Sequence, residues 1–181
     1  VTKCKCSDCM LSCVCVCVCV SGFFFLRVAK VLVSFVAGVG AGTLSPKPPE
    51  RAQCTIHAEC EENAEGVSGH NELQSLGART LAIVTLSGLT PGAHGLHVHR
   101  CADFSNGCAS TCEHYNPGGV SSHGGPLGPN RHKGDFGNIY ADTNGKCTQQ
   151  HIIVATNLGE TVGRAFIVHA DPDDYGGGGH E

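Results

Sequence analysis

The sequence predicts an all-β protein, on the evidence of its composition and of its hydrophobic pattern. Its 181 residues include 25 glycines and no tryptophan, and charged residues make up only 15%. An average soluble domain has about 25% charged residues. Short β-branched runs alternate with turn-forming residues, and no long stretch shows helical periodicity. These observations favour a loop-rich β fold over a helical one.

The net charge argues against two classes of partner. The chain carries a formal net charge of −4 at pH 7 and has no run of basic residues. Nucleic acids and anionic membrane surfaces are bound through basic patches. We therefore expect no nucleic-acid partner and no stable membrane contact.

Residues 1–42 have the pattern of a leader that precedes the domain. Arg27 and Lys30 come before an apolar run at 31–39, and small residues follow up to Gly42. This order is typical of a secretory signal with cleavage near Ala41, so we expect a secreted protein of the extracellular space. A membrane-spanning signal anchor is the alternative, although the two basic residues interrupt its apolar run.

Cysteines are concentrated in this leader. Residues 13–20 alternate Cys and Val like a strand, but a repetitive coding sequence also yields this pattern, and we interpret it as an unselected leader. A metal-binding arm made of Cys4, Cys6 and Cys9 is the alternative. Six further cysteines are scattered along the rest of the chain: Cys54, Cys60, Cys101, Cys108, Cys112 and Cys147. This scatter suits an oxidising compartment, but the sequence alone does not determine their pairing.

The domain itself begins after a short linker. Residues 43–52 include a Pro-rich stretch, and the domain spans 53–181. Alternation predicts strands at 54–58, 67–74, 79–86, 94–99, 137–141, 151–155 and 164–169. An Asn-Gly pair at 144–145 predicts a hairpin turn between two of them. Residues 100–133 show no alternation, and a loop of this length is usually functional or disordered.

One strand carries two closely spaced histidines. In an extended strand His97 and His99 point to the same face, about 7 Å apart, so they can share a metal ion. Val98 then points into a core. A His-x-His pair alone is more often two surface histidines, so the interpretation depends on further ligands elsewhere.

The long loop supplies such ligands. His114, His123 and His132 occur at nine-residue intervals, and Asp135 follows three residues later. Three imidazoles and one carboxylate suit a closed tetrahedral zinc site, whose metal would offset the cost of ordering the loop. His97, His99 and His169 remain on strands, and an all-nitrogen site on a rigid scaffold suits a redox-active copper.

Five separated motifs resemble the Cu/Zn superoxide dismutase family in order and spacing. They lie at 95–99, 114–117, 123–126, 132–138 and 163–169, with Cys108 six residues before His114. The resemblance covers about 53–181 and implies a Greek-key β-barrel or sandwich with long metal-binding loops.

The resemblance also implies a role for each matched residue. The residues that match the copper ligands are His97, His99, His114 and His169. The residues that match the zinc ligands are His114, His123, His132 and Asp135. His114 would be a bridging imidazolate, Asp173 would link His97 to His123, and His94 would be a structural histidine between loops.

The implied activity is the disproportionation of superoxide to dioxygen and hydrogen peroxide, an antioxidant reaction. Copper would cycle between two oxidation states, and zinc would be structural and electrostatic. Because the chain carries a net negative charge, attraction of the superoxide anion must be local. We expect the full-length protein to be a homo-oligomer, a dimer or higher.

The sequence also departs from the family. It ends inside the loop after the last copper ligand, and the family's anion-binding arginine, final strand and cysteine partner for the residue matching Cys108 lie beyond that point. Arg164 matches the Gly-Arg before the last copper strand and does not replace the missing arginine, and Arg100 stands where the family usually has an acidic residue. We expect a sequence truncated at both ends, with the final strand missing and a sheet edge exposed.

Two other functions remain open from the sequence. One is a copper chaperone that carries a dismutase-like domain and a Cys-rich arm. The other is a secreted sandwich that binds zinc for stability and has no catalytic activity.

Overall fold

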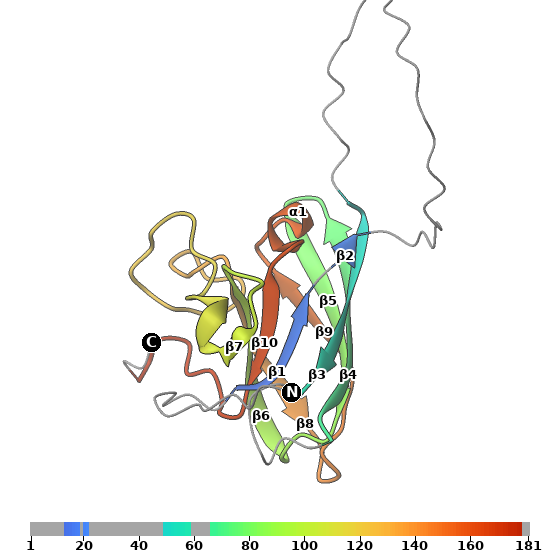
Figure 1. Ribbon diagram of the computed structural model, residues 1–181. Helices are drawn as coiled ribbons and strands as arrows, with labels where there is room; N and C mark the ends of the chain where they lie inside the picture. The colour runs from blue at the N-terminus through green and yellow to red at the C-terminus, as the bar shows by residue number, and fades with distance from the viewer. Residues whose placement is uncertain (1–12, 19, 22–48, 59–65, 179–181) are drawn as a thin grey trace, which may run out of the picture.

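Antiparallel β-strands form the framework of the molecule (Figure 1). The computed structural model describes residues 13–18, 20–21, 49–58 and 66–178. The strands are β1 (Cys13–Val18), β2 (Val20–Ser21), β3 (Arg51–His57), β4 (Ser68–Leu76), β5 (Arg79–Ser87), β6 (Gly92–His99), β7 (Ser105–Cys108), β8 (Asp135–Ala141), β9 (Cys147–Val154) and β10 (Ala165–His169). A 3-10 turn, η1 (Ala109–Thr111), and one short helix, α1 (Leu158–Thr161), complete the described elements.

The described strands other than β7 form one sheet, whose hydrogen-bonded neighbours follow the path β8-β6-β10-β1-β3-β4-β5-β9, with β2 paired to β3. The two ends of the path, β8 and β9, are joined by a tight turn in which Gly145 N donates to Asp142 O at 2.9 Å. Near this turn the Tyr140 amide donates to the Gln150 side chain at 2.7 Å. The sheet therefore curls around its core, and the predicted all-β Greek-key fold is confirmed.

The core is built from strands in which buried residues alternate with more exposed ones. In β5 every second residue is buried: Thr80, Ala82, Val84 and Leu86. Phe136 of β8 and Phe166 of β10 meet edge to face, with ring centroids 5.2 Å apart. Both belong to the same buried cluster as Ile56 and Leu73 from the other half of the sheet. Burial of this apolar surface is the main source of stability in such a fold.

Strand β10 is buried on both faces, which fixes the position of the histidine at its end. Phe166 and Val168 belong to the main core. Ala165 and Ile167 point the other way and pack under Phe104 and Cys108 of the long loop. A strand covered on both sides is nearly all apolar, as β10 is.

The N-terminal strand was not anticipated as part of the sheet. β1 pairs antiparallel with β10, from Cys13 opposite His169 to Val18 opposite Ala165. Val16 is also opposite His57 of β3. The expectation of an exposed edge is therefore wrong for β10 and β3, because β1 pairs with both.

Other parts of the predicted leader lie outside the described residues. These are Cys4, Cys6 and Cys9, the signal pattern at 22–42, and residues 43–48 of the linker. The domain limits and the signal remain predictions. None of the helices within the described ranges is long and apolar enough to span a membrane.

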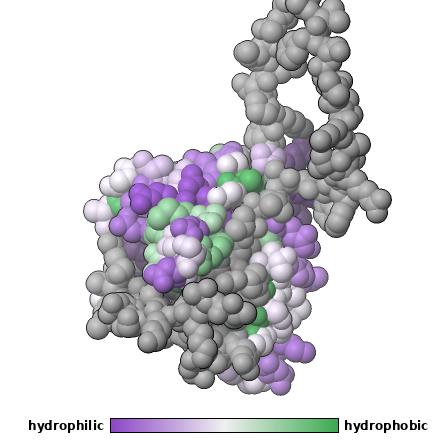
Figure 2. All heavy atoms as spheres, in the orientation of Figure 1, coloured by the Kyte–Doolittle hydropathy of each residue, from purple (hydrophilic) through white to green (hydrophobic). Residues whose placement is uncertain are grey.

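The outer surface is mixed in character. Large exposed apolar residues are dispersed over several elements, at Leu76, Leu127, Tyr140, Ile153 and Tyr175. The described atoms in Figure 2 show hydrophilic and apolar residues interspersed on the visible face. Scattered apolar side chains of this kind are normal on a protein surface.

Candidate metal centre

A closed cycle of three backbone hydrogen bonds brings three distant segments together. Val98 N donates to Gly134 O, Gly134 N donates to Tyr115 O, and Tyr115 N donates to Val98 O, each at 2.8 Å. A Cβ atom on Gly134 would stand 2.2 Å from Val98 O, so only glycine allows this close approach. The cycle places the histidines of β6 beside those of the long loop.

The first group that results contains four imidazoles. Its members are His97, His99, His114 and His169, and one ring nitrogen from each lies within 4.8 Å of the others. The His97 ring centroid is 4.1 Å from that of His114 and 4.8 Å from that of His169. We call this set the four-histidine group.

The second group contains three imidazoles and a buried carboxylate. Its members are His114, His123, His132 and Asp135, and we call it the aspartate group. Oδ1 of Asp135 lies 2.9 Å from Nδ1 of His114, 2.9 Å from Nδ1 of His123 and 3.5 Å from Nδ1 of His132. Ligands about 2.0 Å from a tetrahedral metal stand about 3.3 Å apart, so these spacings suit zinc.

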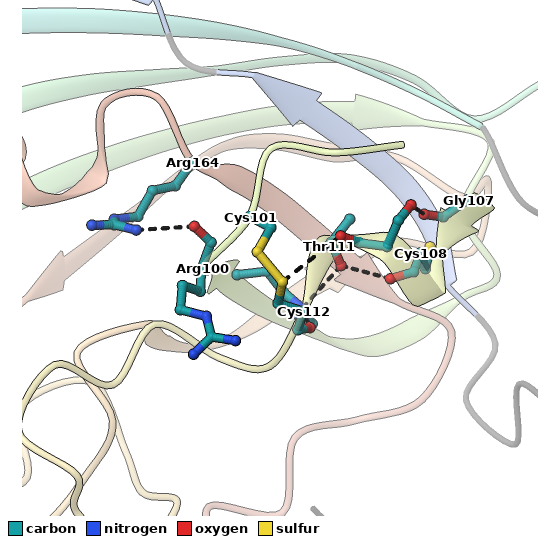
Figure 3. The surroundings of a disulfide bond; sticks show 9 residues. Arg100, Cys101, Gly107, Cys108, Thr111, Cys112 and Arg164 are labelled. Carbon is teal, nitrogen blue, oxygen red and sulfur yellow. Dashed lines mark hydrogen bonds between the residues drawn. A yellow bond between two sulfur atoms is a disulfide. The ribbon is translucent and has the colours of Figure 1, made fainter. Parts of the chain in front are cut away.

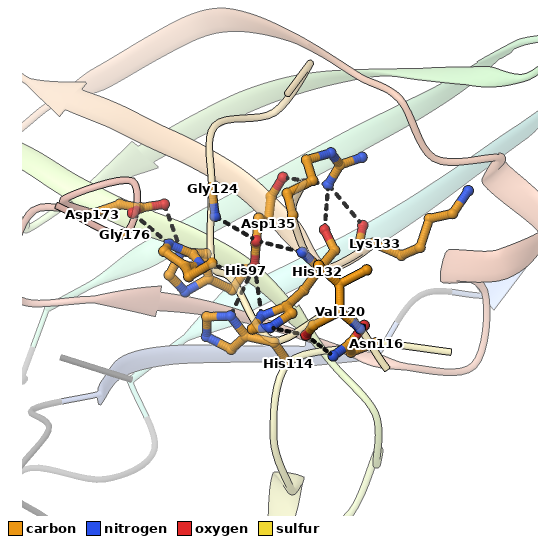
Figure 4. A network of polar contacts seen from close by, with 12 residues as sticks. His97, His114, Asn116, Val120, Gly124, His132, Lys133, Asp135, Asp173 and Gly176 are labelled. Atoms are coloured by element: carbon orange, nitrogen blue, oxygen red, sulfur yellow. Dashed lines mark hydrogen bonds and ion pairs between the residues drawn. The ribbon is translucent and has the colours of Figure 1, made fainter. Parts of the chain in front are cut away.

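His114 belongs to both groups. Its Nδ1 faces Asp135, so its Nε2 is the ring atom left for the four-histidine group. Its backbone pairs with that of His99 in an isolated bridge, which holds the ring between the two groups. Figure 4 shows His114 beside Asp135 and His132.

The free ring nitrogens test whether these residues fit metal ions. Five buried ring nitrogens of the two groups form no hydrogen bond in the described part of the chain: Nδ1 of His97, His123 and His132, and Nε2 of His99 and His169. Those of His123 and His132 face Asp135 Oδ1 as ion-pair contacts only. A buried polar atom without a partner is costly, so such a cluster needs another explanation. Metal coordination would provide it, because these atoms gather in the two groups.

In several of these histidines, the ring nitrogen that is not free for a metal makes a contact that orients the ring. The opposite nitrogen of His99 contacts the Cys112 carbonyl at 2.7 Å, and that of His132 contacts the Val120 carbonyl at 3.1 Å. Asp173 contacts both His97 and His123. Metal-binding histidines characteristically use their second nitrogen in this way, which fixes the tautomer and the ring direction.

Burial keeps most of the four-histidine group neutral. It lowers the pKa of His97, His99 and His169 from 6.5 to about 3, and repulsion between neighbouring imidazoles adds to the effect. The neutral imidazole is the form that binds a metal ion. These rings are therefore ready to act as ligands at pH 7.

The carboxylates have the opposite effect at His123. Burial lowers the pKa of this histidine, but the nearby carboxylates of Asp135 and Asp173 outweigh burial and raise the pKa to about 10. For both carboxyls burial raises the pKa, but hydrogen bonds from histidines and backbone amides, together with the charge of a neighbouring histidine, lower it by more. A metal ion that enters the aspartate group must therefore displace a proton from His123.

His94 is not part of either group. Its Nδ1 lies 2.8 Å from the His169 carbonyl, and its Nε2 lies 2.8 Å from the Thr90 carbonyl. The ring thus links the turn before β6 to the end of β10.

Three-dimensional structure reveals supporting residues that the sequence did not indicate. Arg131 is buried and donates to the carbonyls of His132, Lys133 and Asp135, and to the Thr156 hydroxyl. Its position directly before the predicted ligand His132, in a chain with few charges, was the signal that the sequence offered. Asn138 exchanges two hydrogen bonds with the backbone of Asp173.

The cysteines of the long loop form one described disulfide, between Cys101 and Cys112. Cys108, the disulfide candidate from the resemblance, is not part of this bond and packs against Ala165 and Ile167. Arg164, which the resemblance places before the last copper strand, contacts Tyr115 and Arg100. Its guanidinium lies 3.6 Å above the Tyr115 ring and donates to the Arg100 carbonyl.

Comparisons with known proteins identify the family of the chain. The family model for copper/zinc superoxide dismutase matches residues 67–181, a range that includes both groups. Among solved structures, a crystal structure of the clock protein EA4 is similar, with a TM-score of 0.66 and 32% sequence identity. The similarity covers 75% of this chain and 85% of that one. The chain therefore belongs to the copper/zinc superoxide dismutase family.

Proposed function

We propose that this chain disproportionates superoxide to dioxygen and hydrogen peroxide at a centre that holds one copper and one zinc. The observation that carries the proposal is the set of five buried ring nitrogens without a hydrogen bond in two groups that share His114. The four-histidine group would hold copper, and the aspartate group would hold zinc. Membership of the family supports the same reaction.

The metals would supply chemistry that the side chains lack. A bound copper supplies one-electron oxidation and reduction, and a bound zinc adds positive charge and rigidity. The chain's own part is to hold neutral imidazoles in fixed directions. Asp135 and Asp173 fix the ring directions through hydrogen bonds to His114, His123 and His97.

His114 is positioned to take up and release a proton. Reduction of superoxide to hydrogen peroxide consumes protons, so a group beside the reacting anion must hold and release one. Nδ1 of His114 is engaged on the Asp135 side, and Nε2 faces the four-histidine group. We assign to Nε2 the uptake and release of that proton.

We further propose that the protein is secreted and acts as a homo-oligomer. The Cys101–Cys112 disulfide supports an oxidising compartment, where such bonds persist. Mass spectrometry of protein from the culture medium of expressing cells tests secretion. Retention of all the protein inside the cells would contradict it, and size-exclusion chromatography with light scattering tests the oligomer.

The activity is tested with two histidine variants of the full chain. Both variants and the parent are loaded with copper and zinc, and the disproportionation of superoxide is followed by pulse radiolysis or stopped flow. His169→Ala removes a ligand of the four-histidine group and should lower the rate by at least a hundredfold. His151→Ala is the matched control, because His151 is exposed on β9, and its rate should equal that of the parent.

Two results would contradict the proposed activity. One is a loaded parent chain with no activity above that of the free metal ions. The other is an active chain whose rate is unaffected by His169→Ala.

A further inference from the structure

The disulfide Cys101–Cys112 closes a small loop just before the shared histidine. The two Cα atoms are 5.5 Å apart. The flanking backbones are paired, because Arg100 N donates to Glu113 O at 2.9 Å and Cys101 N donates to Thr111 O at 3.0 Å. Figure 3 shows the bond between Cys101 and Cys112. It joins the segment just after β6 to the segment that leads into His114.

Cys112 has a backbone conformation that side chains rarely adopt. Its φ is 66° and its ψ is −163°. This region of backbone space is essentially restricted to glycine, and other residues persist there only when their surroundings hold them. The disulfide is the covalent restraint on this residue.

The strained residue contacts a ligand of the four-histidine group. The Cys112 carbonyl lies 2.7 Å from Nδ1 of His99, and the Thr111 hydroxyl lies 3.1 Å from the same atom. That hydroxyl donates to the Cys108 carbonyl at 2.7 Å, so its proton is already used. Nε2 of His99 is then the buried atom without a described partner.

We propose that the Cys101–Cys112 disulfide is a positioning device for His99. It holds Cys112 in the glycine-type conformation, so that its carbonyl accepts the Nδ1 proton and directs Nε2 toward the other imidazoles. Without the bond, Cys112 relaxes to a negative φ and its carbonyl turns away from His99. The inference deepens the proposed function, because it makes copper affinity depend on a bond outside the ligand set.

The aspartate group has its own supports. Asp135 accepts hydrogen bonds from the amides of Gly124 and His132, and Arg131 holds the adjoining carbonyls. None of these contacts involves the disulfide. Loss of the bond should therefore weaken the four-histidine group more than the aspartate group.

Two double variants of the full chain separate the bond from the conformation that it holds. Cys101→Ser with Cys112→Ser removes the bond and leaves a residue that disfavours positive φ. Cys101→Ser with Cys112→Gly removes the bond but supplies the residue that adopts this φ freely. Neither variant has a thiol at these two positions, so the pair is matched.

Affinities for Cu²⁺ and Zn²⁺ are measured by competition with a chelator. The serine variant should bind Cu²⁺ at least tenfold more weakly than the parent, with Zn²⁺ affinity within threefold. The glycine variant should recover Cu²⁺ affinity to within threefold of the parent. Parental Cu²⁺ affinity in both variants would overturn the inference, as would an equal loss in both.

A second measurement needs no metal and keeps the test valid if the serine variant does not fold. Long-range proton–nitrogen NMR of the metal-free protein reports the tautomer of His99. The parent and the glycine variant should both carry the proton on Nδ1, and a different tautomer in either would overturn the inference. If the parent binds no copper, the proposed function fails, but the tautomer still decides the role of the disulfide.

Discussion

His123 and Asp173 are joined by a hydrogen bond of 2.6 Å, from Nε2 of the ring to Oδ1 of the carboxylate. The other oxygen, Oδ2, accepts from Nε2 of His97 at 2.9 Å. His97 belongs to the four-histidine group and His123 to the aspartate group. One carboxylate thus orients a ring in each group and couples the two.

Asp173→Asn should prevent this residue from accepting hydrogen bonds from His97 and His123 at the same time. An amide has one acceptor oxygen, so only one of the two rings can keep its acceptor. We expect the affinity for Cu²⁺, for Zn²⁺ or for both to fall by about 10- to 100-fold, as measured by chelator competition. Asp171→Asn is the control because Asp171 is exposed, and equal affinities in the two variants would contradict the role given to Asp173.

Gly134→Ala should disrupt the cycle that joins the ligand segments. The added methyl group would stand 2.2 Å from Val98 O and 2.8 Å from Tyr115 N, and neither backbone can move without breaking the cycle. We expect a loss of about 3 kcal/mol in the free energy of unfolding, measured with urea on the metal-free protein. Gly118→Ala should leave stability nearly unchanged, because the nearest contact there is a Val120 methyl at 3.8 Å.

Buried histidines should make the stability of the metal-free protein depend on pH. The folded-state pKa of His97, His99 and His169 is about 3, against 6.5 for an ordinary histidine, so the unfolded chain binds more protons between these values. Stability must then fall as the pH drops from 6.5 toward 3. His123, with its pKa raised to about 10, contributes stability that is lost as the pH rises from 6.5 to 10.

The urea midpoint of the metal-free protein should therefore be highest near pH 6.5. It should fall more steeply on the acid side, where three histidines act together. A midpoint that stays constant between pH 4 and pH 7 would contradict the neutral state assigned to the four-histidine group.

The strands were largely predictable because each carries its own pattern. The run at 79–86 alternates, and the structure has β5 at Arg79–Ser87. Residues 13–20 also alternate, but a pattern does not name the partner strand, so the pairing of β1 with β10 and β3 was missed. The helix α1 was missed because it has four residues, held by a capping box of Asn157 and Glu160 and not by a periodic apolar face.

In the candidate metal centre, too, the residue types could be predicted from the sequence, but their supporting contacts could not. Imidazoles and a carboxylate reveal their chemistry in the sequence, and the structure brings the predicted residues into two groups. The pairing of Cys101 with Cys112 and the contacts of Arg131 depend on how the loop folds. No local pattern encodes those contacts.

The β1 strand provides a direct test of the sheet. Val16 is the residue of β1 that lies opposite both Ile167 and His57. Val16→Pro removes an amide donor from an inner strand, which a sheet tolerates poorly. Amide hydrogen exchange in β10 and β3 should then become at least tenfold faster, while β4 and β5 stay protected.

Val16→Ala is the control for this substitution, because it shortens the same side chain but keeps the amide donor. Its exchange should resemble that of the parent. Unchanged exchange in β10 of the proline variant would mean that β1 does not close the sheet in solution.

The shared position of His114 is the central claim, and metal content tests it most directly. The full chain is incubated with Cu²⁺ and Zn²⁺, dialysed, and analysed by inductively coupled plasma mass spectrometry beside His114→Ala. We predict one copper and one zinc per parent chain, and a loss of both metals in the variant. A parent chain that retains zinc without copper, or a variant that retains both metals, would contradict the account.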